Sequence, residues 1–327
     1  MRLVIPLLFV FIYLSCSTNP PVDVDDSFEA GKLFITSNVT GASIYVNNNN
    51  TGKVTPDTIS VPIGNVTVKI EKDGYIPSSK NVIVTLDSII SLDFTLLIAN
   101  VTKIVLLEDF SNVSCGPCVG TNKAIESLKK YAFGSRILPI RFSTNFPSPN
   151  DPFYTANKPD CNARMVLYAI QSSPTVVVDG ILFPVSTDSN SIKQRIESRL
   201  TETPKFKITA SDSVSGSEYF VKIKVENIDT TGLKFSDLFI HTVVTETEIE
   251  YTTPPGSNGE TKFHDVMRKM LPSSSGENLS QMFPGSEVLL ERQVSISSSW
   301  NISKLNTVVF IQNKTTKEVI QAVSTNN

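Results

Sequence analysis

The chain has 327 residues, a formal net charge of −3 and a pI near 5.6, with 40% hydrophobic and 19% charged residues. This length predicts about two domains, and the apolar content excludes wholesale disorder. The mild negative charge argues against a nucleic-acid partner, because phosphate binding needs a basic surface. The sequence contains only two histidines, His241 and His264. This scarcity disfavours histidine-based metal sites and Ser/His or Cys/His catalytic triads.

The first segment of the sequence is a predicted export signal. Arg2 is followed by an apolar run over residues 3–14, which ends just before Cys16. The run is shorter than the ~20 residues of a membrane-spanning helix, which favours a secretory signal over an uncleaved membrane anchor. Residues 14–16, Leu-Ser-Cys, resemble a bacterial lipoprotein signal, in which an enzyme cuts before the cysteine and lipidates it. The resemblance implies lipidation at Cys16, followed by a tether rich in proline and aspartate.

Residues 32–97 show short alternating strands separated by turns. Asp73-Gly74 is one such turn signal, and a run of asparagines at 47–50 is another. The pattern predicts a compact antiparallel β-sandwich. Residues 41–46, Gly-Ala-Ser-Ile-Tyr-Val, and 72–75, Lys-Asp-Gly-Tyr, resemble the PEGA repeat domain. That resemblance implies a spacer or adhesion module without chemistry. The predicted strands centre on residues 33–35, 43–46, 66–70 and 82–86.

The candidate chemistry lies in a Cys-x-x-Cys motif between a predicted strand and a predicted helix. An apolar run at 104–107 is typical of a buried strand, and apolar residues recur at helical spacing over 124–132. Cys115 is therefore expected at a helix N-terminus, where free N–H groups and the helix dipole favour a thiolate. A thiolate attacks a substrate disulfide, and a second cysteine resolves the mixed disulfide. Cys115 is thus the candidate nucleophile and Cys118 the resolving thiol.

Residues 107–118 resemble thioredoxin, both in the Cys-Gly-Pro-Cys motif and in its spacing to the preceding strand. The resemblance implies a thioredoxin-like fold in which Asp109 is a buried acid that assists proton transfer to and from the resolving cysteine. Residues 172–180, Ser-Ser-Pro-Thr and an apolar run, resemble the cis-proline loop and its strand. By this resemblance Pro174 packs against the cysteine pair and leaves nearby backbone free to bind an extended peptide.

Several features leave the activity of the motif open. Ser114 and Ser173 stand where thioredoxins usually carry other residues, and a Pro- and Asn-rich stretch at 145–159 has no counterpart in thioredoxin. A Cys-x-x-Cys is also half of a zinc site, but no second one exists here, so no metal is expected. In an oxidising envelope the pair can instead persist as an inert structural disulfide. Cys161 is an odd thiol, either an alternative partner for Cys115 or a small buried hydrophobe.

Residues 204–327 form a second predicted β domain. Strand-like runs recur without helical patterns between them, which predicts a β-sandwich. Residues 263–271 are an exception, a charged and apolar segment on a long connection. Residues 108–110, 263–271, 308–312 and 318–322 are similar to a family of bacterial outer-membrane lipoproteins, outer membrane protein twenty-eight and its relatives. The resemblance covers roughly 101–327 and implies a location more than an activity.

The expected fold class is multidomain α/β plus all-β, with a thioredoxin-like α/β domain between two β-sandwich domains. The leading hypothesis for function is thiol–disulfide exchange on envelope proteins. Its partners are protein thiols or disulfides and, for a reductant, a membrane electron donor. The alternative is a non-catalytic surface binding or assembly lipoprotein with a structural disulfide. The expected location is the outer membrane, facing the periplasm or the surface, and no cofactor is expected. The expected boundaries are 1–15 signal peptide, 16–31 lipidated tether, 32–97 PEGA-like domain, 98–203 thioredoxin-like domain and 204–327 C-terminal β-sandwich.

The export signal makes a direct prediction about the mature protein. We expect residues 1–15 to be removed and Cys16 to carry the lipid, because the enzyme that recognises such signals cuts before the cysteine. Intact-mass spectrometry of the membrane-extracted protein measures this. A mature chain that still carries its first fifteen residues would contradict the prediction.

Overall fold

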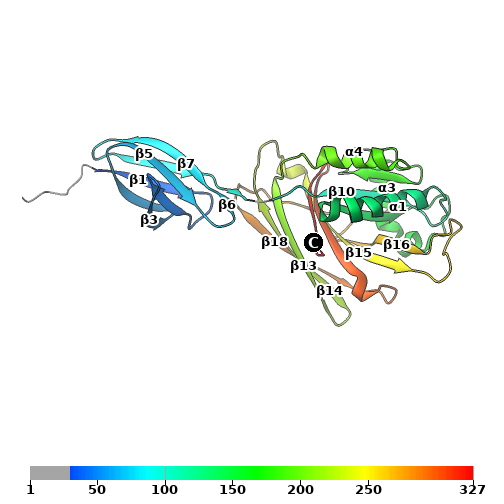
Figure 1. The fold of residues 1–327 in the computed structure, drawn as a ribbon. Coiled ribbons are helices and arrows are strands. Elements are labelled where there is room, and N and C mark those ends of the chain that lie inside the picture. Colours follow the sequence, from blue (N-terminus) through cyan, green and yellow to red (C-terminus); the bar gives the residue numbers. More distant parts are fainter. Residues whose placement is uncertain (1–29, 100, 327) are drawn as a thin grey trace, which may run out of the picture.

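The computed structural model describes residues 30–99 and 101–326, so the export signal and Cys16 lie outside the described residues. A small N-terminal β domain is joined to a larger body (Figure 1). Strand accounts for 46% of the described residues and helix for 18%. Strands therefore form the framework of both parts.

The N-terminal domain is a sandwich of two sheets, with strand orders β4-β1-β8 and β3-β2-β5-β7. Alternation along β1 places Leu33 and Ile35 in the core, where neither is exposed. The pairing is antiparallel except between β1 and β8, which run parallel. This differs from the expected all-antiparallel sandwich, because the chain crosses from one sheet to the other between β7 and β8. The strands are β1 Ala30–Ser37, β2 Ser43–Val46, β3 Asn49–Val54, β4 Asp57–Pro62, β5 Gly64–Glu71, β6 Tyr75–Ile76, β7 Ser78–Val84, β8 Ile89–Phe94 and β9 Leu97–Ile98.

A specific contact joins the N-terminal domain to the body. The Nδ2 of Asn38, just after β1, donates a hydrogen bond to the carbonyl oxygen of Pro284 at 2.8 Å. The next residue in the body, Gly285, packs so closely that a Cβ there would lie 2.6 Å from the same Nδ2. Glycine is therefore required at this joint, where its φ is also +81°.

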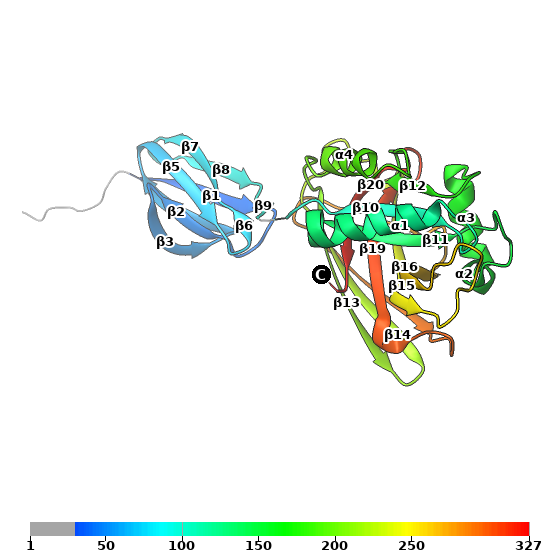
Figure 2. The ribbon, with the colours of Figure 1, turned by 45° about the vertical axis from the view of Figure 1, so that its right-hand side comes forward.

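One eight-stranded sheet forms the centre of the body, in the order β12-β10-β11-β16-β15-β19-β20 with β17 paired to β15 (Figure 2). β10 runs parallel to β11 and antiparallel to β12. β11 in turn meets β16 in parallel, through the pair Arg141 and Val266. The strands are β10 Val105–Ser111, β11 Ile137–Ser143, β12 Thr175–Val178, β15 Leu238–Glu250, β16 Lys262–Leu271, β17 Glu277–Asn278, β19 Leu305–Asn313 and β20 Val319–Ser324.

A second sheet and several helices cover this central sheet. The second sheet has the order β13-β14-β18, and its inner face packs on β15 and β19 through residues such as Val221, Ile240 and Val309. Helices α1 and α4 cover β10 and β12, with Ile125 and Ile196 in the shared cluster. The remaining elements are β13 Phe206–Ser215, β14 Glu218–Asn227, β18 Glu287–Ser295, α1 Cys118–Ser127, the π-helical η1 Leu128–Phe133, α2 Pro152–Ala156, α3 Lys158–Tyr168, α4 Ser189–Arg199, and the 3₁₀ turns η2 Gly134–Arg136, η3 Phe235–Asp237 and η4 Ile302–Lys304.

The expected thioredoxin-like α/β domain between two β-sandwiches is wrong. Strands from residues 105–178 and from 238–324 share one sheet and one core, in which Leu106 and Phe110 pack with Val243 and Phe310. The physical reason is that β10 and β11 are buried along their whole length, so both faces and both edges require partners. The C-terminal half supplies them. Residues 263–271, expected on a long connection, form β16 and take part in the same sheet.

A buried ion cluster lies between the end of β12 and the start of β20. Asp179 accepts from Lys103 Nζ at 2.8 Å and from Arg199 Nε at 2.9 Å, and its other oxygen accepts the N–H of Leu106. Arg199 also pairs with Glu318 at the start of β20. Burial lowers the pKa of Lys103, and the neighbouring Asp179 opposes this shift. Through Asp179 and Arg199, the cluster thus ties together the start of β10, the end of β12, α4 and the start of β20.

A second buried network spans the central sheet. Glu108 on β10 is fully buried and accepts from Arg164 on α3 at 2.7 Å and from the hydroxyl of Tyr168 at 2.6 Å. Gln312 on β19 then bonds both Arg164 and Tyr168. Every charge in this network has a partner, which is the condition under which buried charges persist.

The ion cluster predicts a large loss of stability on truncating its centre. Asp179→Ala should lower the free energy of unfolding by about 3–5 kcal/mol, because Lys103 is left buried without its counter-ion. Glu202→Ala is the matched control, since Glu202 pairs with the same Arg199 but is about half exposed. Its effect should stay within about 0.5 kcal/mol. Equal losses of unfolding free energy in the two variants on urea denaturation would show that the buried ion pairs stabilise the fold no more than the exposed pair does.

Candidate functional site

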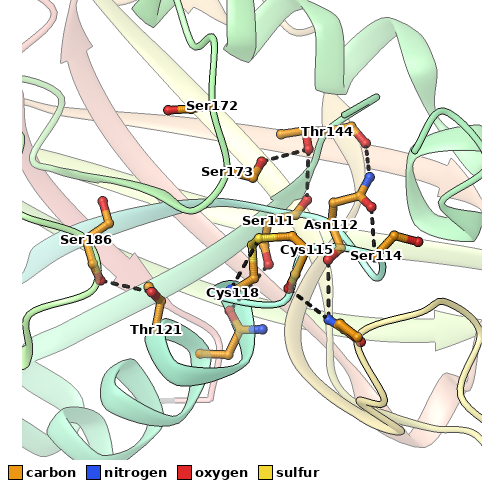
Figure 3. Close-up of a disulfide and its surroundings, with 12 residues drawn as sticks. Ser111, Asn112, Ser114, Cys115, Cys118, Thr121, Thr144, Ser172, Ser173 and Ser186 are labelled. Carbon is orange, nitrogen blue, oxygen red and sulfur yellow. Dashed lines mark hydrogen bonds between the residues drawn. A yellow bond between two sulfur atoms is a disulfide. The ribbon is translucent and has the colours of Figure 1, made fainter. Parts of the chain in front are cut away.

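The two cysteines of the motif form a disulfide at the start of α1 (Figure 3). Pro117 caps the helix, and the N–H of Cys118 lies 3.2 Å from the sulfur of Cys115. Cys115 is 3% exposed and Cys118 is fully buried. The expected strand and helix around the motif are β10 and α1, but the sulfur atoms do not lie open to solvent.

A loop from the C-terminal half packs against the segment that leads into Cys115. This covering loop, residues 251–261 between β15 and β16, bonds to the backbone next to the cysteines. The N–H of Asn258 donates to the carbonyl oxygen of Val113 at 3.1 Å, and its Nδ2 lies 3.4 Å from the carbonyl oxygen of Cys115. Gly256 approaches so closely that a Cβ there would lie 2.3 Å from the carbonyl oxygen of Val113. The loop therefore leaves Cys115 little exposed surface.

The Pro- and Asn-rich stretch holds the segment just before the motif. Asn112 donates from Nδ2 to the carbonyl oxygens of Thr144 and Ser148, at 2.7 and 2.9 Å. The N–H of Val113 donates to the carboxylate of Asp151, which also caps α2. The stretch and the covering loop thus hold the segment before Cys115 from two directions.

Pro174 lies in the loop that faces the disulfide. The Ser173–Pro174 peptide bond is cis, and the hydroxyl of Ser173 lies 2.9 Å from that of Thr144 (Figure 3). Thr144 in turn bonds the carbonyl oxygen of Ser111 at the end of β10. The roles assigned to Pro174 and to the cysteines in exchange chemistry stay predictions.

Asp109 lies in a small polar cavity next to α1. Asn122, Arg141 and Asp265 line this cavity, and no cysteine does. Asp109 is 3% exposed, and its Oδ1 has no hydrogen-bond partner among the described residues. Burial raises the pKa of Asp109 to about 6, although Arg141 at 3.5 Å opposes the shift and Glu260 adds to it. Asp109 is therefore a buried acid whose charged form is destabilised.

Sequence reasoning missed the residues that the covering loop contributes. Glu260 accepts two hydrogen bonds from Nδ2 of Asn122 on α1, at 2.8 and 2.9 Å, and lies 3.7 Å from Arg141. Asn258 bonds Glu260 as well. The one local signal is the Asn258-Gly259 pair, which marks a turn but not what the turn covers.

Cys161 is buried in the main core on α3 and is 1% exposed. Burial raises the pKa of its thiol to about 12, so it is protonated at neutral pH. The structure supports the interpretation of Cys161 as a small buried hydrophobe, and its pairing with Cys115 stays a hypothesis. Among residues 30–99 and 101–326, no group of three or more His, Cys, Asp or Glu side chains could hold a metal ion. In the same part of the chain, no helix is long and apolar enough to cross a membrane.

The raised pKa of Asp109 predicts a pH-dependent stability. Because its folded pKa of about 6 exceeds the ordinary 3.8, the group favours folding at low pH and that contribution is lost as the pH rises through 6. The loss amounts to about 3 kcal/mol. Asp109→Asn removes it, so the free energy of unfolding of the variant should rise relative to wild type between about pH 4 and about pH 7. Parallel urea-denaturation profiles for the two proteins would contradict this assignment.

Comparisons with known proteins agree with this architecture. A model of the PEGA domain matches residues 30–100, and a model of the outer membrane protein Omp28 matches residues 162–326. No curated protein matches the chain. HBP35 of Porphyromonas gingivalis is similar in fold, with a TM-score of 0.56 at 14% identity, over 68% of this chain and 74% of its own.

Two further solved structures are more distant. A domain of the outer membrane lipoprotein Omp28 from Porphyromonas gingivalis matches 38% of this chain and 88% of its own, at 17% identity and a TM-score of 0.25. A protein from Agrobacterium tumefaciens matches 69% of this chain and 95% of its own, at 14% identity and a TM-score of 0.45.

The family models confirm two of the resemblances, the one to the PEGA domain and the one to the outer-membrane protein family. The Omp28 match covers half of the chain and supports the expected place in the outer membrane. The PEGA match covers the N-terminal sandwich. The chain therefore belongs to the Omp28 family of outer membrane proteins and carries a PEGA domain at its N-terminus.

Proposed function

We propose that this protein is a binding or assembly component of the outer membrane, in which Cys115–Cys118 is a static disulfide. The observation that carries the proposal is the burial of the disulfide: Cys115 is 3% exposed, and Cys118 is fully buried. Reactive cysteines lie in electropositive, partly exposed places, whereas buried structural cysteines are inert. A disulfide that is buried to this extent is suited to stabilising the local fold.

The contacts around the disulfide explain what it would hold. Asn258 donates from Nδ2 to the carbonyl oxygens of Asn112 and Cys115, and Glu260 accepts from Asn122 on α1. The covering loop, the start of α1 and the end of β10 therefore meet at the disulfide. A short cross-link at this point keeps the segment against which the loop packs in one conformation.

The parts outside the body support a role in contact rather than in chemistry. Lipidation at Cys16 would hold the chain at the membrane, and the PEGA domain would then separate the body from the lipid surface. Asn38 bonds the loop before β18, so this spacer is docked on the body. Such an arrangement presents the body at a distance from the membrane, where a partner can reach it.

Thiol–disulfide exchange is the second candidate. The observation that favours it is the N–H of Cys118, which lies 3.2 Å from the sulfur of Cys115 at the N-terminus of α1 and would stabilise a thiolate there. This function would require the covering loop to move before a substrate could reach the sulfur. Its partners would be envelope protein thiols or disulfides and a membrane electron donor.

The reduction potential of the disulfide separates the two functions. We expect a value below about −300 mV, as for structural disulfides, when the mature chain is equilibrated with dithiothreitol and the free thiols are alkylated and weighed. A value between about −120 and −270 mV would instead indicate an exchanger. The double variant Cys115→Ser/Cys118→Ser should lose about 2 kcal/mol of stability, the estimate for closing so short a loop.

A variant of the covering loop tests whether the loop limits access to the disulfide, with the rate of reduction as the readout. Asn258→Ala removes the side-chain bonds to Asn112 and Cys115, and should make reduction of the native protein by dithiothreitol about tenfold faster. Asn49→Ala on the PEGA domain is the control and should leave the rate unchanged, because β3 lies in the other part of the chain. A rate for Asn258→Ala equal to that of wild type would show that the loop does not limit access.

A further inference from the structure

A cavity of about 270 Å³ lies between α3 and the strands β15 and β19, beside the turn that joins β19 to β20. Apolar atoms of Val166, Leu167 and Phe239 form part of its wall. The rest is polar and basic, and no carboxylate and no cysteine line it. The cavity is therefore separate from the disulfide, and its chemistry is that of an anion site with an apolar side.

His241 lines this cavity, and one of its ring nitrogens has no hydrogen-bond partner among the described residues. The residue is 5% exposed, its ring stacks on Phe310 at 4.9 Å, and its Nδ1 has no partner among the described residues. Burial, with Arg164 nearby, lowers the pKa of His241 to about 3, so the ring is neutral and carries one N–H and one acceptor nitrogen. Buried polar groups without partners are uncommon, and a ligand is one explanation for such a group.

Arg164 reaches the same cavity with one N–H to spare. A guanidinium has five N–H donors. Glu108 takes Nε and one hydrogen of Nη2, Tyr168 takes the other hydrogen of Nη2, and Gln312 takes one hydrogen of Nη1. The second Nη1 hydrogen has no bond within the described part of the chain. Because three partners already fix the guanidinium, this donor is held in place before a ligand arrives.

Two lysines on the β19–β20 turn add positive charge to the cavity wall. Lys314 and Lys317 both line it. The carboxylate of Asp237 interacts electrostatically with Lys314, so part of the positive charge on that side is already balanced. The Nζ of Lys314 lies 5.0 Å from the centroid of the Phe239 ring, which is itself part of the wall. A cation over an aromatic ring leaves its outer side free to meet an anion.

We propose that this cavity binds a small organic carboxylate, with the carboxylate near Arg164, Lys314 and Lys317 and an apolar or aromatic body against Phe239 and Val166. The inference deepens the binding role proposed above and rests on it, but it does not depend on the state of the disulfide. The volume lies just below the roughly 300–1,000 Å³ of pockets that hold drug-sized ligands, so it fits a compact ligand of one or two rings.

The apolar part of the cavity wall favours an organic carboxylate over an inorganic anion. A phosphate or sulfate would satisfy the cations but would leave the apolar side of the cavity in contact with nothing. An amphipathic ligand covers that side and gains from its burial. The neutral ring of His241 can bond a polar atom on the body of such a ligand, which a purely inorganic anion does not offer.

Isothermal titration of the mature chain with naphthalene-2-carboxylate, naphthalene-2-carboxamide and inorganic phosphate tests the proposal. We expect the carboxylate to bind at millimolar concentration or below, the neutral amide to bind at least about tenfold more weakly, and phosphate not to displace the carboxylate. Absence of carboxylate binding, equal binding of the amide, or displacement by phosphate would each overturn it. The disulfide potential is measured separately, so failure here is distinguishable from failure of the proposed function.

Variants locate the binding in this cavity. Lys314→Glu/Lys317→Glu should weaken carboxylate binding by about tenfold, because two partly exposed cations become anions. Lys32→Glu/Lys53→Glu on the PEGA domain makes the same change in net charge, so it is the matched control and should bind as wild type does. Ala163→Leu places a larger side chain in the cavity wall and should abolish binding. Retained affinity in the lysine variant would overturn the proposal even if the leucine variant did not fold.

Discussion

The body of this protein depends on the pairing of Asp179 with two buried cations. Lys103 precedes the central sheet, Arg199 ends α4, and Asp179 follows β12, so one carboxylate joins segments that are far apart in the chain. Lys103 also donates to the carbonyl oxygen of Val319 on β20. A buried charge without its partner is strongly destabilising, so these segments have to assemble together. The two halves of the body are therefore one folding unit.

Local patterns were sufficient for the elements and insufficient for their assembly. The Cys-x-x-Cys motif was expected between a strand and a helix, and β10 and α1 lie on either side of it. The PEGA resemblance also rested on short motifs and was confirmed. The fold class was wrong because β11 pairs with β16, more than a hundred residues later, through a single pair of residues. No local alternation specifies such a partner.

The candidate site, too, could be predicted from local sequence only in part. A short motif sufficed to find Cys115, but its exposure is decided by Asn258 and Gly256, which follow it by about 140 residues in the sequence. Glu260 likewise reaches Asn122 from the far half of the chain. A cysteine motif indicates which chemistry is available, and the packing of a distant loop decides whether a substrate can use it. The cavity beneath α3 could not be foreseen at all, because Arg164 and His241 meet only across the merged core.

The parallel pairing of β1 with β8 has a mechanical consequence. The chain enters the PEGA domain at the start of β1, at the end away from the body, and leaves it after β8 toward the body (Figure 1). The two strands are in register from Lys32 with Ile89 to Ser37 with Phe94. A pull between a membrane anchor and a partner on the body would load these pairs in shear, so that their hydrogen bonds resist together rather than opening one after another. The spacer is thus built to withstand tension along its long axis.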